Sequence, residues 1–433
     1  MEPSIVGGIG IVLLLVILFL QLPIAFTMTL IGLVGFGYLV SPDASLRLLA
    51  TDFYDIFSSY NLTVAPLFIL MGQIAFHSGI SGRLFACAYK FMGNTRGGLA
   101  IATIAASAGF ASICGSTNAS AATMATVSLP EMKKYQYNMG LATGTVAAGG
   151  TLGILIPPST IFIIYGIMTE QSIGTLFLAG IVPGILLSIL FILTVAIIVR
   201  LKPEMGPAGP VVTWREKFKS LGSVFEMFLI FVLVMTGLFK GFFTPTEAGA
   251  AGAGITLAVA ALRRMITFEA FMLAVMDTVK VSCMVLTIIA GATIFGHFLA
   301  ITRIPYDLAA TVQHLPLPGW TIIGIIIAIY FIGGCFMDSL AMILLTIPIF
   351  FPVIISLGYD PVWFGVIIVL VGEMGVITPP VGINVYVVNG VAKDVPLHTI
   401  FKGCIPFVIA LVICNFLLIF FPKIALFLPN ALQ

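Results

Sequence analysis

The chain has 433 residues, of which 60% are hydrophobic and only 8% are charged. Because soluble domains carry about 25% charged residues, this composition excludes an ordinary globular enzyme and predicts a polytopic membrane protein embedded in the lipid bilayer. The formal net charge of +2 excludes a polyanion-binding surface, so no nucleic acid is expected as a partner.

Ten apolar runs suggest membrane crossings, each of which needs about 20 residues. In chain order they are Ile5–Leu22, Ile24–Val40, Leu62–His77, Leu141–Tyr165, Ile173–Val199, Phe225–Phe242, Ala248–Leu262, Val281–Ala300, Val362–Val388 and Cys404–Phe421. Two amphipathic segments, Ser45–Tyr60 and Arg263–Lys280, predict helices lying in the membrane interface, with plain loops as the alternative.

Two further apolar stretches, Leu99–Leu129 and Trp320–Ile355, are too long for one crossing, and each carries a polar or glycine-rich break near its middle. A kinked helix is one explanation. A re-entrant hairpin, which enters and leaves on one face of the membrane, accounts better for both the length and the polar tip.

An offset of 222 residues brings the glycines and prolines of the two halves into register. The matching positions are Pro23 with Pro245, Gly97 with Gly319, Pro130 with Pro352, Gly150 with Gly372, Gly153 with Gly375, and Pro157-Pro158 with Pro379-Pro380. Since glycine and proline dictate backbone shape, this agreement predicts a two-fold structural repeat.

Basic residues predict how the two halves are oriented, because cytoplasmic loops hold an excess of Lys and Arg. The linker after the first half is basic, whereas Tyr306–Gly319 and Ser356–Pro361, which flank the second hairpin, contain no Lys or Arg. The first hairpin is flanked by Arg83, Lys90, Arg96, Lys133 and Lys134. The linker is therefore expected in the cytoplasm, both termini outside, and the two halves in inverted topology, as in secondary transporters.

The twin proline pairs each interrupt an apolar helix soon after paired glycines, so Gly149–Pro158 and Gly372–Pro380 are expected to be unwound. Carbonyl groups freed in hydrocarbon need a partner, and a bound cation such as Na+ supplies one; a kink patched by a neighbouring Ser or Thr is the alternative. The hairpin tips add oxygen atoms from Ser112, Ser116, Thr117 and Asn118 in the first half and from Asp338 and Ser339 in the second.

Two acids lie inside apolar stretches, where an ionisable group is functional by default. Asp338 is expected to neutralise a cation, with a proton-carrying role as the alternative. Glu373 suits a gate, a proton site or a solvated position near the cavity.

No Lys or Arg lies in the apolar arms of either hairpin or in either unwound segment, so a bound organic anion would depend on helix N-termini, hydroxyl groups and co-bound cations. A cationic substrate would instead pair with the two acids.

The chain contains no phosphate-binding loop and no nucleophile constellation, so neither nucleotide hydrolysis nor another enzyme activity is expected.

Several motifs together resemble the large membrane subunit of tripartite ATP-independent periplasmic (TRAP) transporters. They include Pro66-Leu-Phe-Ile-Leu-Met-Gly72, Arg96-Gly-Gly-Leu99, Ile113-Cys-Gly-Ser116, Leu129-Pro-Glu-Met132, Ile156-Pro-Pro-Ser159 and Thr378-Pro-Pro-Val-Gly382.

This resemblance implies an all-α, Na+-coupled elevator importer in a bacterial inner membrane. It also implies two partners, a small four-helix membrane subunit and a periplasmic binding protein that delivers an organic anion, either a carboxylate or a sulfonate. The frame is expected at 1–61, 62–98 and 223–318, the moving part at 99–199 and 319–422, the cytoplasmic linker at 200–222 and a tail at 423–433. One departure is that many relatives carry an Asp in the first tip, whereas Ser112–Pro130 contains no acid.

The resemblance also implies at least two Na+ sites. The first would use Ser112, Ser116, Asn118, Gly150, Gly153 and Pro157, and the second would use Gly334, Met337, Asp338, Gly372, Gly375 and Thr378. The anion is expected to contact Thr117, Asn118, Pro158, Ser159, Ser339 and Pro380. Two alternatives remain open at this point: a binding-protein-independent dicarboxylate or ion symporter of similar fold, and a channel or membrane scaffold.

Overall fold

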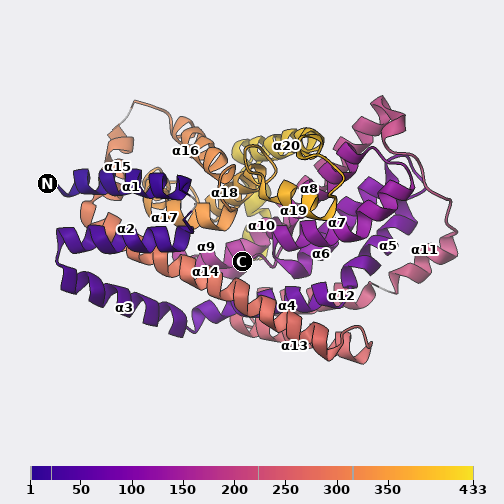
Figure 1. Cartoon of the computed structure of the whole chain (residues 1–433), viewed down its shortest axis with the longest axis horizontal. Coiled ribbons are helices and arrows are strands. Elements are labelled where there is room, and N and C mark those ends of the chain that lie inside the picture. Colours follow the sequence, from indigo (N-terminus) through magenta and orange to yellow (C-terminus); the bar gives the residue numbers. More distant parts are fainter. Residues whose placement is uncertain (1, 21, 223, 315, 433) are drawn as a thin grey trace.

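A computed structural model describes residues 2–20, 22–222, 224–314 and 316–432, and the described part of the chain consists of helices and their connections (Figure 1). The expected boundary at Ser223 lies outside these residues. The first half contains α1 (Pro3–Phe19), α2 (Ile24–Leu39), α3 (Pro42–Ser58), α4 (Val64–His77), α5 (Ile80–Met92), α6 (Gly98–Cys114), α7 (Thr117–Lys134), α8 (Met139–Leu155), α9 (Thr160–Met168) and α10 (Ile173–Leu201).

The linker carries a short helix, α11 (Trp214–Leu221), and the second half follows. It contains α12 (Phe225–Phe239), α13 (Pro245–Leu262), α14 (Phe268–Thr302), α15 (Ile304–His314), α16 (Gly319–Gly334), α17 (Ser339–Ser356), α18 (Pro361–Gly375), α19 (Ile383–Val391), α20 (Leu397–Phe420) and α21 (Lys423–Leu432). The tail expected at 423–433 is thus helical over its described residues.

The expected repeat is visible in the helix boundaries. Helices α7 and α17 begin at Thr117 and Ser339 and end at Lys134 and Ser356, both 222 residues apart (339 − 117 and 356 − 134). Each follows a partner helix, α6 or α16, and the break between the two arms lies at the polar tip that the sequence indicated. In the first break Gly115 has φ +61°, a conformation that favours glycine, and this residue lets the chain reverse into α7.

Both proline-interrupted helices are broken, but over shorter segments than expected. Helix α8 remains helical to Leu155 and α18 to Gly375, so the unwound residues are only 156–159 and 376–382. The prediction that unwinding begins at Gly149 and Gly372 is wrong. The glycines continue the helix and pack closely against neighbouring helices and hairpin tips, and each helix ends shortly before its Pro-Pro pair.

The arms differ between the two halves. Helix α3 bends by 57° from the Asn61–His77 segment that continues into α4, as expected for a separate arm. Residues 268–280, however, form the first turns of the uninterrupted 35-residue helix α14, so a separate arm at Arg263–Lys280 is not observed. The stretch Tyr306–Gly319, which was expected to be a loop, contains most of α15.

By length and composition, five spans of the described chain could cross a membrane, with α8 and α9 together (Met139–Met168) counted as one, or seven if each bent pair also counts as one span. This is fewer than the ten crossings expected, because several apolar helices, among them α1 and α2, are only 16 or 17 residues long.

The ends of the molecule are chemically different. Figure 1 places α5 and α11 at one end of the long axis and the N-terminus and α15 at the other. The linker packs beneath the open end of the first hairpin, where the backbone N–H of Gly97 donates to Gly206 over 2.8 Å and that of Gly209 donates to Gly93 over 2.7 Å. The basic residues of the linker and of the first hairpin therefore gather at the same end.

Candidate functional site

The tips of the two hairpins meet on one buried carboxylate. The hydroxyl of Thr117, the first residue of α7, donates to Oε2 of Glu373 over 2.8 Å, and that of Ser339, the first residue of α17, approaches Oε1 at 3.2 Å. Thr117 and Ser339 are equivalent in the repeat, and Glu373 is fully buried in α18. A single side chain thus joins the hairpin tips of the two repeat halves.

Each pair of helix glycines lies against the backbone of its hairpin tip. A Cβ atom added to Gly153 would lie 2.6 Å from the carbonyl oxygen of Ser116 and 2.7 Å from the hydroxyl of Ser120. In the second half, a Cβ on Gly375 would overlap the backbone of Gly334. The absence of side chains at these glycines lets the helix backbone approach the tip backbone closely in both halves.

Four helices begin at this point. Ser116 caps α7, Asp338 caps α17 and Ser159 caps α9, each accepting a hydrogen bond from a backbone N–H of its helix, while α19 begins after Gly382 in the left-handed conformation. A helix N-terminus carries a partial positive charge and unpaired N–H groups. Their convergence makes the site attractive to a negatively charged ligand.

A cavity of about 1220 Å³ lies between these tips and helices α1, α2 and α14. It is lined on one side by Ser116, Thr117, Asn118 and Asp338, and on the other by apolar side chains of α1, α2 and α14. The ring of Phe336, beside the second tip, packs edge-on against Phe19 at the end of α1, with centroids 5.8 Å apart. No Lys or Arg lines the cavity among the described residues.

The residues expected to bind Na+ lie around the two tips. Ser116 and Asn118 face the cavity, whereas Gly150 and Gly153 are buried within α8, and Pro157 lies in the first break. The Ser112 hydroxyl is engaged within its own helix, donating to Gly109 over 2.7 Å. In the second half, Met337 and Asp338 face the cavity, Gly334 ends α16, Gly372 and Gly375 lie in α18, and Thr378 donates to the carbonyl of Met374.

The residues expected to touch the anion are less uniformly placed. Among the described residues, only Thr117 and Asn118 of this set line the cavity. Ser159 and Ser339 are buried in a helix cap and in the Glu373 contact, Pro158 is buried in the first break, and Pro380 is exposed in the second.

Two polar side chains that the sequence did not single out lie beside the glycines. The hydroxyl of Ser120 and the Oδ1 atom of Asn384 are buried and have no hydrogen-bond partner among the described residues. The amide of Asn384 donates to the carbonyl of Ala147, which places this residue of α19 next to Gly150 of α8. Only their position, three residues into α7 and one residue into α19, could have suggested them.

The whole chain matches one family of transport proteins. Residues 11–424 match the model described as Tripartite ATP-independent periplasmic transporter, DctM component. The chain is 36% identical over 393 residues to the C4-dicarboxylate TRAP transporter large permease protein DctM of Pseudomonas aeruginosa, covering 90% of this chain and 91% of that protein. It is 32% identical to the sialic acid TRAP transporter large permease protein SiaM of Vibrio cholerae, covering 99% and 98%.

A solved structure has the same fold at low identity. The YdaH transporter of Alcanivorax borkumensis superposes with a TM-score of 0.67 at 13% identity, covering 88% of this chain and 89% of that one. This likeness concerns the fold alone. The family match over nearly the whole length and the identities above 30% identify the chain as a member of the TRAP transporter large permease family.

Proposed function

We propose that this permease imports an organic anion together with Na+ and that both bind where the two hairpin tips meet. The observation that carries the proposal is the charge balance of the site. Asp338 and Glu373 lie close together there, and no Lys or Arg of the described chain lines the adjoining cavity. Two carboxylates in a low-dielectric environment need cations, since an unpaired buried charge is costly.

The atoms around the glycines fit Na+ as a co-transported substrate. Hard cations take oxygen ligands from carbonyl, hydroxyl and carboxylate groups. Beside Gly153, the Ser116 carbonyl and the unpartnered Ser120 hydroxyl occupy the space that a side chain would fill. The amide group of Asn384 lies beside Gly150 through its nitrogen, and its Oδ1 atom has no hydrogen-bond partner among the described residues. A cation held there would satisfy buried oxygens that otherwise lack a partner.

The anion is expected in the cavity, at the starts of the four helices. Helix N-termini and hydroxyl groups bind carboxylates or sulfonates without a basic side chain, and Na+ bound beside them supplies positive charge. Anion affinity then depends on Na+ occupancy, which is the coupling that a symporter needs. The relatives named for C4-dicarboxylate and for sialic acid support an organic acid as the substrate class.

The family description names a tripartite, periplasmic system, so we infer two partners: a small membrane subunit and a periplasmic binding protein that delivers the anion. The clustering of basic residues at the α5 and α11 end favours that end in the cytoplasm of a bacterial inner membrane. Both termini would then lie on the periplasmic side.

Movement of the two hairpins and broken helices as one body against the frame accounts best for the cavity. The surface between the tips and α1, α2 and α14 is mostly apolar, so sliding breaks few polar contacts. Phe336 sits beside Phe19, next to the α1–α2 connection, which the proposed topology puts on the cytoplasmic side. Under the proposed topology, we assign this arrangement to an inward-facing state.

Uptake into proteoliposomes tests the proposal. The permease, its small partner subunit and purified binding protein would be supplied with labelled succinate, sialic acid or isethionate in separate arms, under an inward Na+ or K+ gradient. We expect uptake of one acid that requires both Na+ and the binding protein. Equal uptake in Na+ and K+ would overturn the coupling, and uptake without binding protein would favour the self-sufficient symporter.

A further inference from the structure

A second cavity, of about 450 Å³, lies where the starts of α8 and α20 meet the end of α10. Part of its wall is backbone. A Cβ atom on Gly403 would overlap the carbonyl group of Gly140, and a Cβ atom on Gly144 would overlap the carbonyl group of Gly403, so α8 and α20 touch without intervening side chains. The second cavity is a notch beside this contact, and it shares no lining residue with the cavity at the hairpin tips.

The notch has a basic mouth and apolar walls. Lys202 and Lys402 line it together with His398, whereas none of its described lining residues is acidic. Both lysines are exposed, and neither forms an ion pair with another described residue. Two cationic groups held at one opening, without an acidic partner, leave an unneutralised positive charge there.

The lysines stand at the ends of two strongly apolar surfaces. Helix α10 exposes aliphatic side chains at every fourth position from Ile185 to Ile197, and α20 does so from Ile405 to Ile413. Residues four apart share one face of a helix, so each helix presents a continuous apolar stripe that ends at the notch. Apolar surface of this kind faces lipid tails in a membrane protein.

We propose that this notch binds the headgroup of an anionic phospholipid, whose acyl chains lie along α10 and α20. The site and a phospholipid match in sequence from surface to core: the lysines would face the charged headgroup, and the apolar stripes of α10 and α20 would face the hydrocarbon chains. Basic pockets between transmembrane helices on the cytoplasmic side bind such headgroups. A soluble phosphate would use the lysines but would gain nothing from the apolar stripes. The site is separate from the transport site, and the proposal does not rest on Na+ coupling.

The test measures lipid retention by the purified full-length protein in nanodiscs of phosphatidylcholine with a minor fraction of phosphatidylglycerol. Each Lys near an anionic surface contributes about fivefold in affinity, so Lys202→Ala with Lys402→Ala should weaken phosphatidylglycerol binding roughly 25-fold. Replacing both by Arg should preserve binding. The matched control is Arg215→Ala with Lys219→Ala, which removes two exposed basic groups from α11 and should leave retention unchanged.

Three results would overturn the proposal. Equal losses in the double variant and the control would mean general surface attraction rather than a site. Equal retention of phosphatidylcholine and phosphatidylglycerol by the unmodified protein would remove the charge argument. Full displacement of the lipid by glycerol phosphate would assign the notch to a soluble phosphate. Circular dichroism of each variant would establish that all of them remain folded.

Discussion

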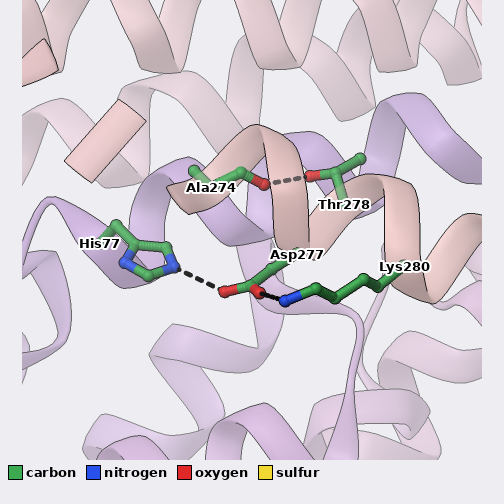
Figure 2. Close-up of polar contacts among 5 residues, drawn as sticks. All are labelled: His77, Ala274, Asp277, Thr278 and Lys280. Atoms are coloured by element: carbon green, nitrogen blue, oxygen red, sulfur yellow. Dashed lines mark hydrogen bonds and ion pairs between the residues drawn. The ribbon is translucent and has the colours of Figure 1, made fainter. Parts of the chain in front are cut away.

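His77 and Asp277, which are 200 residues apart, meet where the end of α4 crosses the early turns of α14, with Nε2 of the histidine 3.1 Å from Oδ2 of the aspartate (Figure 2). Lys280 approaches the other oxygen of the same carboxylate at 3.4 Å. A related contact joins Asp52 of α3 to His297 of α14, at 3.6 Å. Each half thus supplies an aspartate to a histidine of the other half, Asp52 from α3 and Asp277 from the early turns of α14, and the two pairs join the halves.

Asp277→Asn should therefore loosen the frame. The pair is partly exposed, so the expected loss is modest, about 1 kcal/mol of unfolding free energy, seen as a lower Tm in detergent. The control is Asp55→Asn, since Asp55 is the repeat equivalent of Asp277 and is exposed. Equal Tm values for the two variants would show that the His77 contact does not stabilise the frame.

Asp338→Asn separates two roles of one side chain. Asp338 caps α17 by accepting the N–H of Leu340 over 3.1 Å, and Asn caps a helix about as well as Asp does. We expect an unchanged Tm but a rise of about tenfold in the Na+ concentration for half-maximal uptake, equal to roughly 1.4 kcal/mol. Asp338→Ala should lose the cap as well, and its Tm should fall. An unchanged Na+ requirement in the Asn variant would remove Asp338 from the cation site.

Glu373→Gln should also raise the Na+ concentration needed for half-maximal uptake, because it removes a buried negative charge. The variant keeps one oxygen atom that can accept a hydrogen bond. Since the carboxylate joins Thr117 to Ser339, the variant should also lower the cooperativity of uptake with respect to Na+. The matched control is Thr151→Val at the repeat-equivalent position, where the hydroxyl only donates to Ala148 in its own helix. A Na+ titration of initial uptake rates measures both quantities, and identical titrations for the two variants would contradict the assignment.

Gly72→Ala should disturb the contact between frame and moving part. A Cβ atom there would lie 2.6 Å from the carbonyl oxygen of Cys114 at the end of α6, so the first tip must shift away from α4. We expect slower uptake and a loss of about 1–3 kcal/mol in stability, as for other overpacked sites. Gly254→Ala, on α13 with open space around it, is the control. Uptake at the rate of the unmodified protein would mean that this contact is not part of the cycle.

The proposed orientation predicts which surfaces can be labelled from outside. In a cysteine-free background, Lys423→Cys should react with a membrane-impermeant maleimide in intact cells, whereas Lys219→Cys should react only after the cells are opened. Both positions are exposed, so access to the protein surface does not limit either reaction. The reverse pattern would invert the topology.

The sequence predicted the elements that glycine and proline control. Both hairpins, both broken helices and the repeat appear where Pro157, Pro379 and the polar tips indicated, because these residues act on the local backbone. The extent of unwinding was wrong, since Gly150 and Gly372 continue their helices when packed against a tip. That packing is a tertiary effect, which local patterns do not contain.

The contacts within the site were harder to predict. Thr117 and Glu373 are 256 residues apart, and the repeat aligns Glu373 with a threonine, so symmetry pointed away from a shared bridge. Ser120 and Asn384 carry no motif and become notable only because the fold buries an oxygen of each without a partner. The straight course of α14 was missed for a similar reason, because an amphipathic start followed by an apolar run fits either a bent or a continuous helix.

The two halves differ in one helix: α14 is uninterrupted, whereas a 57° bend separates α3 from the segment that contains α4. This difference has an energetic consequence for the proposed transport cycle. In a fully symmetric inverted repeat, the two extreme positions of the moving part would be related by a two-fold rotation and would have equal free energy. Here one half has a continuous helix where the other half has a bend, so the two positions are not equivalent and are expected to differ in free energy even without any gradient. The empty carrier is therefore expected to rest on one side of the membrane, and ligand binding must supply the work of returning it.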